Sequence, residues 1–84
     1  LAACVNVVPG LRSVYRWKGA VEDDPESLLV LKTAADRVEA LAQKVVELHP
    51  AEVPEVLSIA PEGGYGPYID WVVAATRDDE PPGA

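Results

Sequence analysis

The sequence contains no methionine and no apolar run that approaches the length of a membrane span. Because a spanning helix needs about 18 or more consecutive apolar residues, the sequence predicts no such helix. No basic segment followed by an apolar one stands at the start, so no signal peptide is recognised. A chain that opens at Leu1 without a methionine is either processed or a fragment, and we expect a fragment.

Cysteine is nearly absent as well. Cys4 is the only one in the chain, so it cannot form an internal disulfide. This usage is typical of a reducing compartment, and we expect a cytoplasmic protein. Between Ala3 and Val5, Cys4 is predicted to be a small buried hydrophobic residue and not a nucleophile.

Basic residues are few. Seven Lys and Arg stand against 14 Asp and Glu, which gives a net charge of −7. Nucleic acids and anionic lipids are bound by basic surfaces, so the sequence predicts neither as a partner. The 84 residues suffice for one domain, placed at 1–76, followed by a disordered acidic and proline-rich tail at 77–84. A domain this small is marginally stable alone and often depends on partners.

Residues 3–33 have the pattern of a long β-hairpin. Residues 3–8 are apolar and rich in valine, and Pro9 with Gly10 then predicts a bend or a bulge. We expect a loop at residues 22–25 and a second strand at 26–33. In between, the chain alternates, and the uncharged row, which we expect to face the core or an interface, consists of Leu11, Ser13, Tyr15, Trp17, Gly19 and Val21.

A helix is predicted next. Thr33 with Asp36 three residues later is an N-cap pattern, and Pro50 ends the helix. Residues 52–60 predict a third strand, and Pro67 is expected to begin a short second helix. The order β-β-α-β-α lacks the alternation of a parallel sheet. The apolar stripe of the first helix consists of Ala34, Val38, Leu41, Val45 and Leu48.

Five stretches, in order along the chain, resemble the CutA divalent-cation tolerance family. They are AACVNVVPG at residues 2–10, SVYRWKG at 13–19, LKT at 31–33, HPAEVPE at 49–55 and YIDW at 68–71. The resemblance implies a ferredoxin-like α+β fold, βαββαβ plus a C-terminal helix. It also implies a homotrimer in which the hairpin pairs with neighbouring subunits across sheet edges, which would cover edges that are otherwise prone to aggregation.

The chain departs from the family pattern in two places. Family members begin with a strand and most of a helix before Leu1, and that strand lies centrally, between the strands expected at 26–33 and 52–60. Without it, buried backbone groups would lack partners, so we expect that the 84 residues alone do not form a stable trimer. The second departure is Ala51, where family members usually carry an aromatic residue after the proline.

His49 is the candidate metal ligand. Imidazole suits copper and zinc, and Glu52 or Glu55 would add oxygen ligands. Pro50 and Pro54, however, prevent the continuous helix on which histidine and glutamate would share a face. The other interpretation is a helix C-terminal histidine that interacts with the helix dipole and the last carbonyls.

The family resemblance strengthens the metal interpretation in part. Members have been linked to copper through this histidine, a histidine directly before it and a cysteine near the first strand. Here only His49 matches that set, because position 48 is Leu48.

No catalytic arrangement is recognised. The GGYG stretch at residues 63–66 lacks the lysine and the spacing of a phosphate-binding loop, and no serine has a histidine at a recognisable distance, so we expect no enzyme. Arg16, Lys18 and Lys32 either hold an anionic ligand or are solvated. An interface or a small-molecule cleft between subunits would be lined by Tyr15, Trp17, Lys32, Glu52, Tyr68 and Trp71. In the alternative, the four aromatic residues among them are anchors that pack the core and the trimer interface.

The sequence therefore predicts a non-enzymatic, homotrimeric protein of the divalent-cation tolerance type that takes part in the response to metal ions. It would bind copper or another divalent cation weakly, at or near subunit interfaces, with His49 as a ligand. The alternatives are a small-ligand signalling trimer like the PII proteins, which rests on fold analogy, and a scaffold that displays loops to a partner protein.

Overall fold

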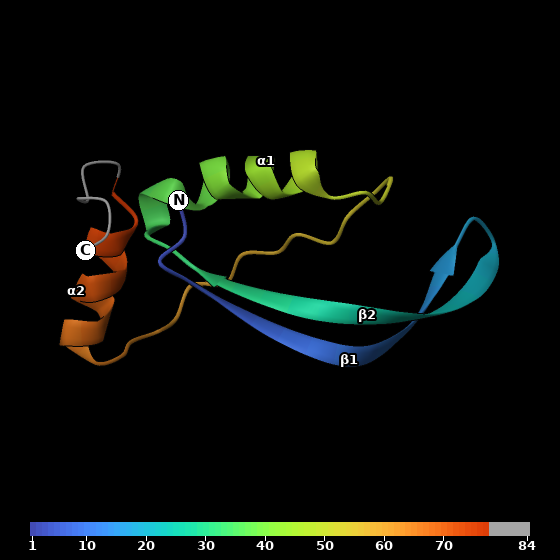
Figure 1. Cartoon of the computed structure of the whole chain (residues 1–84), viewed down its shortest axis with the longest axis horizontal. Coiled ribbons are helices and arrows are strands. Elements are labelled where there is room, and N and C mark those ends of the chain that lie inside the picture. The colour runs from blue at the N-terminus through green and yellow to red at the C-terminus, as the bar shows by residue number, and fades with distance from the viewer. Residues whose placement is uncertain (78–84) are drawn as a thin grey trace.

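A long antiparallel hairpin runs along the molecule and is its largest element (Figure 1). The computed structural model describes residues 1–77. β1 (Cys4–Trp17) and β2 (Ala20–Lys32) pair from Cys4 opposite Lys32 at the base to Trp17 opposite Ala20 at the tip. The predicted hairpin is present, and its second strand begins earlier than expected.

The hairpin turns at Lys18 and Gly19, before the predicted loop at residues 22–25. Both residues have positive φ, 50° for Lys18 and 80° for Gly19, as a two-residue type I′ turn requires. The prediction of one strand through Val21 is therefore wrong. Val21 lies opposite Arg16 and shares its face instead of the face of Trp17.

Pro25 lies inside β2, so the predicted loop at residues 22–25 is also wrong. In an antiparallel ladder, residues alternate between those that bond to the facing strand and those whose amides point outward. Counted from the closing pair Trp17 and Ala20, Pro25 falls on an outward position opposite Arg12. The ladder loses no hydrogen bond there, and the outer edge of β2 lacks one donor.

The hairpin contains a bulge at the predicted position. Val8 lies opposite Leu28 and Leu11 opposite Glu26, so two residues of β1 face a single residue of β2. Gly10, the second residue of the bulge, has φ of 80°, which only glycine adopts without strain. The bulge divides the hairpin into a base and an arm.

Thr33 does not cap the helix, in contrast to the prediction. Its hydroxyl donates to the carbonyl oxygen of Leu1 at 2.6 Å and so fastens the N-terminus to the end of β2. The first turn is a 3-10 helix, η1 (Ala35–Arg37), whose N-cap is Ala34 without a side-chain hydrogen bond. α1 (Val38–Leu48) follows directly.

The end of α1 and the start of α2 lie where the sequence predicts them. His49 is the C-cap of α1 and Pro50 follows it, while Pro67 lies in the first turn of α2 (Gly66–Ala75). Arg77, which the sequence assigned to the tail, donates from its guanidinium to Asp36. The rest of the predicted tail, residues 78–84, lies outside the described residues.

The prediction of a third strand at residues 52–60 is wrong, because these residues form no strand in the structure. A strand needs a hydrogen-bonded neighbour, and in residues 1–77 only β1 and β2 pair. The side chains of Val53, Leu57 and Ile59 are 68%, 78% and 90% exposed. The segment alternates like a strand, but within residues 1–77 no strand pairs with it.

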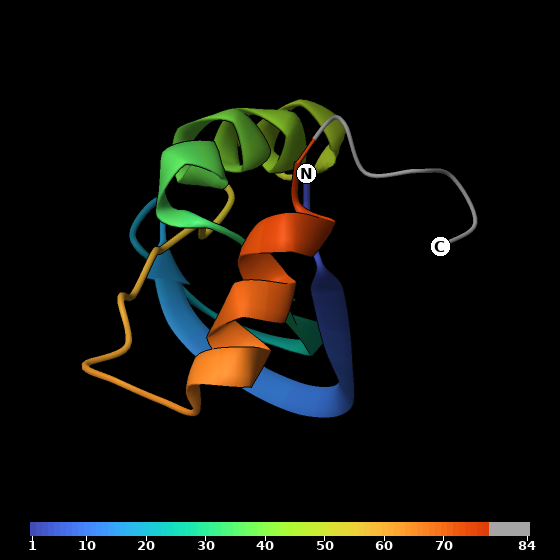
Figure 2. The same ribbon diagram turned by 90° about the vertical axis from the view of Figure 1, so that its left-hand side faces the viewer.

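α1 runs along the hairpin, and α2 stands at a steep angle to it near the base end (Figures 1 and 2). This arrangement is α+β, as the sequence predicts. The core is small, because only Ala34 and Thr76 are buried among the described residues. The predicted stripe of α1 is half-buried at Val38, Leu41 and Val45, whereas Leu48 is exposed.

Much of the apolar surface of the hairpin is exposed. Apolar residues with more than 40% of their surface exposed occur on both faces, and they include Val5, Val7, Val8, Val14, Val21, Leu28, Leu29 and Val30. Monomeric proteins rarely leave such extended apolar patches uncovered. The hairpin therefore has the surface of an element that contacts further protein.

Candidate ligand site

The predicted cleft residues separate into two groups at opposite ends of the hairpin. Tyr15, Trp17 and Glu52 meet near the tip. Lys32, Tyr68 and Trp71 meet at the base, where α2 lies (Figure 1). The single chain does not bring the six residues into one cleft.

The tip group forms a shallow hollow of about 180 Å³, here called the tip hollow, lined by Tyr15, Trp17, Ala51, Glu52 and Val53. Tyr15 and Trp17 are two positions apart on β1, so their side chains extend from the same face. The segment after α1 supplies the other wall. It is joined to the turn by an ion pair between Lys18 Nζ and Glu52 Oε2, at 3.3 Å.

Acidic groups of β2 surround the aromatic side of the tip hollow. The hydroxyl of Tyr15 donates to Asp24 Oδ2 at 2.6 Å. This hydrogen bond, together with desolvation and the negative charges of Asp24, Glu26 and Glu22, raises the pKa of Tyr15 to about 12. Tyr15 therefore remains a neutral hydrogen-bond donor well above physiological pH.

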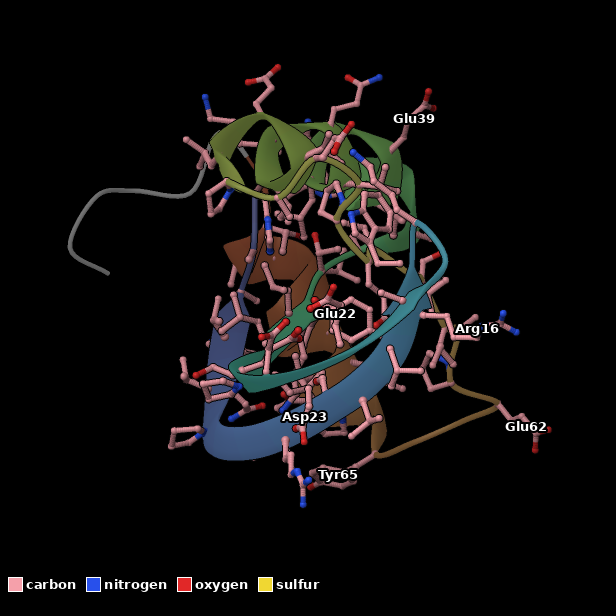
Figure 3. The ribbon with its side chains drawn as sticks, turned by 90° about the vertical axis from the view of Figure 1, so that its right-hand side faces the viewer. Arg16, Glu22, Asp23, Glu39, Glu62 and Tyr65 are labelled. Carbon is pink, nitrogen blue, oxygen red and sulfur yellow. The ribbon has the colours of Figure 1, made fainter. Side chains whose placement is uncertain are left out.

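The opposite face of the arm carries its own ion pair. Arg12 donates to both carboxylate oxygens of Asp23, with 2.8 Å from Nε to Oδ1. The Arg12 guanidinium lowers the pKa of Asp23 below its ordinary value. Figure 3 shows Glu22 and Asp23 extending from opposite faces of β2, so the two sets of acids are separate.

The base group is an aromatic pair with a cation. The Tyr68 and Trp71 rings lie 5.9 Å apart, and Lys32 Nζ is 5.9 Å from the centre of the Tyr68 ring. Tyr68 and Trp71 are three positions apart on α2 and so share one side of the helix. This group links β2 to α2, the role of an aromatic anchor.

The three basic residues predicted as candidates to hold an anionic ligand do not lie close together. Lys18 is paired with Glu52 at the tip, Lys32 lies at the base, and Arg16 extends outward from the other face of β1 (Figure 3). An anion would meet only one of them at a time. Their positions favour surface solvation and local pairing.

His49 is the C-cap of α1, two residues before Ala51 of the tip hollow, and it is exposed. The imidazole Nδ1 accepts a hydrogen bond from the backbone N–H of Ala51 at 3.0 Å. The backbone N–H of His49 donates to the carbonyl oxygen of Val45 at 2.9 Å. With Nδ1 as an acceptor, the neutral ring carries its proton on Nε2. A metal ion at either nitrogen would therefore have to break the bond to Ala51.

No cluster of three or more His, Cys, Asp or Glu side chains suited to a metal ion occurs within residues 1–77. Cys4 is unpaired and half-buried at the start of β1, at the base of the hairpin, whereas His49 ends α1. A metal bound by His49 would need ligands from another chain or from solvent.

The cleft residues predicted from the sequence do not include Asp24, Ala51 and Val53, which lie at or beside the tip hollow. Asp24 is found only when the turn is placed at Lys18 and Gly19, because that register puts it on the face of Tyr15. The signal was a lysine followed by a glycine between two alternating runs. Ala51 and Val53 have no sequence signal, since their position depends on the return of the chain after α1.

Comparisons with known proteins agree on one family. A family model described as "CutA1 divalent ion tolerance protein" matches residues 1–75. Protein CutA homolog of Xenopus laevis is 51% identical over 72 residues, which cover 86% of this chain and 48% of that protein. The chloroplastic Protein CutA of Arabidopsis thaliana is 45% identical over 78 residues, 93% of this chain and 43% of that protein.

A solved structure shows the same fold. It is described as the PII-like protein CutA from Nostoc sp. in apo form, is 38% identical, and has a TM-score of 0.86 over 90% of this chain and 74% of that one. The α+β fold is thus of the ferredoxin-like type. The chain spans about half the length of the curated relatives it matches.

Proposed function

Because this chain belongs to the CutA1 divalent ion tolerance protein family, we propose that it acts as a non-enzymatic homotrimer in the response to metal ions. In this proposal it binds copper or another divalent cation weakly, at or near the contacts between subunits. His49 is the ligand contributed by each chain.

The family match carries the proposal, and the isolation of His49 indicates where the other ligands would come from. Copper and zinc sites usually combine several nitrogen, sulfur or oxygen ligands. Within residues 1–77, His49 has no second and third ligand arranged around it. A site that uses it would draw its other ligands from neighbouring subunits, which makes metal binding depend on assembly.

The hydrogen bond from Ala51 supports weak binding. Coordination through either ring nitrogen removes this bond, whose net contribution is about 0.5–1.5 kcal/mol. That penalty corresponds to as much as about a tenfold loss of affinity relative to an unbonded imidazole. The geometry suits a sensor or buffer of excess metal better than a permanent cofactor site.

The assembly itself has separate support. The exposed apolar residues at the base of the hairpin, together with Leu57 and Ile59, leave one chain with a small core. Neighbouring subunits would cover this surface.

The unpaired Cys4 suits a cytoplasmic location. No helix within residues 1–77 is long and apolar enough to cross a membrane.

A second candidate is a small-ligand signalling trimer. It is favoured by the Nostoc relative described as PII-like and by the aromatic tip hollow. In this case the ligand, and not a metal ion, would change the surface that a partner protein contacts. The scaffold alternative would need neither metal nor ligand.

A copper titration of the full-length protein tests the metal proposal. We expect His49→Ala to weaken Cu²⁺ binding at least tenfold, about 1.4 kcal/mol, while light scattering still gives a trimer. Gln43→Ala, an exposed change on the same helix, is the matched control and should leave the affinity unchanged. Equal affinities of His49→Ala and the parent protein would remove His49 from the site.

A further inference from the structure

The chain places one of its own ammonium groups against the tip hollow. Lys18 Nζ lies 5.6 Å from the centre of the Trp17 ring and 3.3 Å from Glu52 Oε2. An aromatic face and a carboxylate around one ammonium are the elements by which proteins recognise organic cations. We infer that the tip hollow is a binding site for a small organic cation, an alkylammonium group, and that in the free protein Lys18 takes the place of this cation beside Trp17 and Glu52, at the edge of the hollow.

The charges around the hollow select a cation. Glu52 lines it, and Asp24 accepts the hydrogen bond of Tyr15 on the same side. Glu22 lies directly opposite Tyr15 in the ladder and on the same face. Lys18 is the one basic side chain whose ion pair reaches the hollow within the described chain. Without it, the site is negative and repels anions.

The size and the walls select a small group with apolar parts. The hollow of about 180 Å³ is well below the roughly 300–1,000 Å³ of sites for drug-sized ligands, so a nucleotide is excluded. Ala51 and Val53 provide apolar walls next to the aromatic rings. Methyl or methylene groups around a nitrogen fit these walls, whereas a bare metal ion would meet a single carboxylate.

Lys18 is held loosely enough to leave. Its side chain and that of Glu52 are both 68% exposed, and such surface ion pairs are weak. An arriving cation replaces one ammonium with another, so the charge balance of the hollow is kept. Displacement frees Lys18 at the hairpin tip, where it changes the surface offered to a partner. This site does not depend on copper or on His49.

The test uses tetramethylammonium chloride as the probe and the full-length protein labelled for NMR. The indole N–H signal of Trp17, assigned by its loss in Trp17→Phe, should shift in a saturable way. Sodium chloride at equal ionic strength should not produce this shift. The signal of Trp71, at the other end of the hairpin, is the internal control for folding and for salt effects.

Two variants decide the mechanism. Lys18→Met removes the competing ammonium and should tighten probe binding up to about fivefold, as expected for loss of a weak surface pair. Glu52→Gln should weaken it. Lys32→Met, which removes the other ring-bound ammonium, is the matched control and should change nothing at Trp17. A Trp17 signal that does not respond in the parent protein or in Lys18→Met overturns the inference, whatever the copper titration shows.

Discussion

At the scale of single residues, hydrogen bonds to near neighbours decide which groups are chemically available. Tyr15 donates to Asp24, and His49 accepts from Ala51. The first bond keeps the phenol neutral, and the second would have to break before a metal ion could bind either ring nitrogen of His49. Neither partner could be predicted from residue spacing alone, because each depends on a turn whose geometry the sequence leaves open.

The Tyr15 bond gives a pH prediction. The unfolded chain ionises this phenol near pH 10.0, and the folded chain near about 12. The bond therefore stabilises the folded state fully below pH 10.0, and this stabilisation is lost as the pH rises through about 12.

An alkaline titration of tyrosinate absorbance checks it, with Tyr15 assigned by Tyr15→Phe. Asp24→Asn should move the Tyr15 titration down toward pH 10.0. Asp23→Asn, one position away and on the opposite face, should leave it in place. A Tyr15 that titrates at the same pH in Asp24→Asn and the parent would show that Asp24 is not the cause.

At the scale of elements, the sequence predicts what depends on neighbouring residues and misses what depends on distant ones. The hairpin, the bulge at Gly10, the end of α1 and the start of α2 all follow from local patterns. The predicted turn is misplaced because the acidic residues 22–24 and Pro25 are typical of a loop, whereas the structure turns at Lys18 and Gly19 and keeps Pro25 at an outward position of β2. The strand at residues 52–60 could not be judged locally, because its existence depends on a partner strand.

The turn gives a prediction about stability. At φ of 80°, an alanine in place of Gly19 would be strained, and we expect Gly19→Ala to destabilise the protein by about 1 kcal/mol. Gly66→Ala is the control, since Gly66 opens α2 without a positive φ and has open space around its Cβ position. It should be neutral or slightly stabilising. Urea unfolding of the full-length protein measures both, and equal midpoints would contradict the turn geometry.

At the scale of the whole molecule, a single chain buries very few of its described side chains. Ala34 and Thr76 are the buried residues of the described chain, while Leu57 and Ile59 are almost fully exposed. The family resemblance predicted the fold class and the dependence on partners. The candidate site was predicted in part, since Tyr15, Trp17 and Glu52 do meet, but the cleft that would also include Lys32, Tyr68 and Trp71 is not formed within one chain.

We expect the 84 residues alone to be monomeric or polydisperse by light scattering, and to bind a hydrophobic dye without a cooperative melt. The reason is the exposed apolar surface, which one copy of the chain cannot cover. The full-length protein, measured in the same buffer, is the reference. A trimeric mass together with a cooperative melt for the 84 residues would contradict this expectation.

Pro25 limits how copies of the described hairpin can add to one another through their strand edges. Two unpaired edges on a long apolar hairpin would otherwise let copies add to each other without limit, as in fibrils. The missing donor at the outer edge of β2 interrupts any strand that pairs there, so stacking through that edge cannot continue in register. A single imino acid thus disfavours open polymers that grow by strand addition at this edge, and its replacement by valine would restore the missing donor.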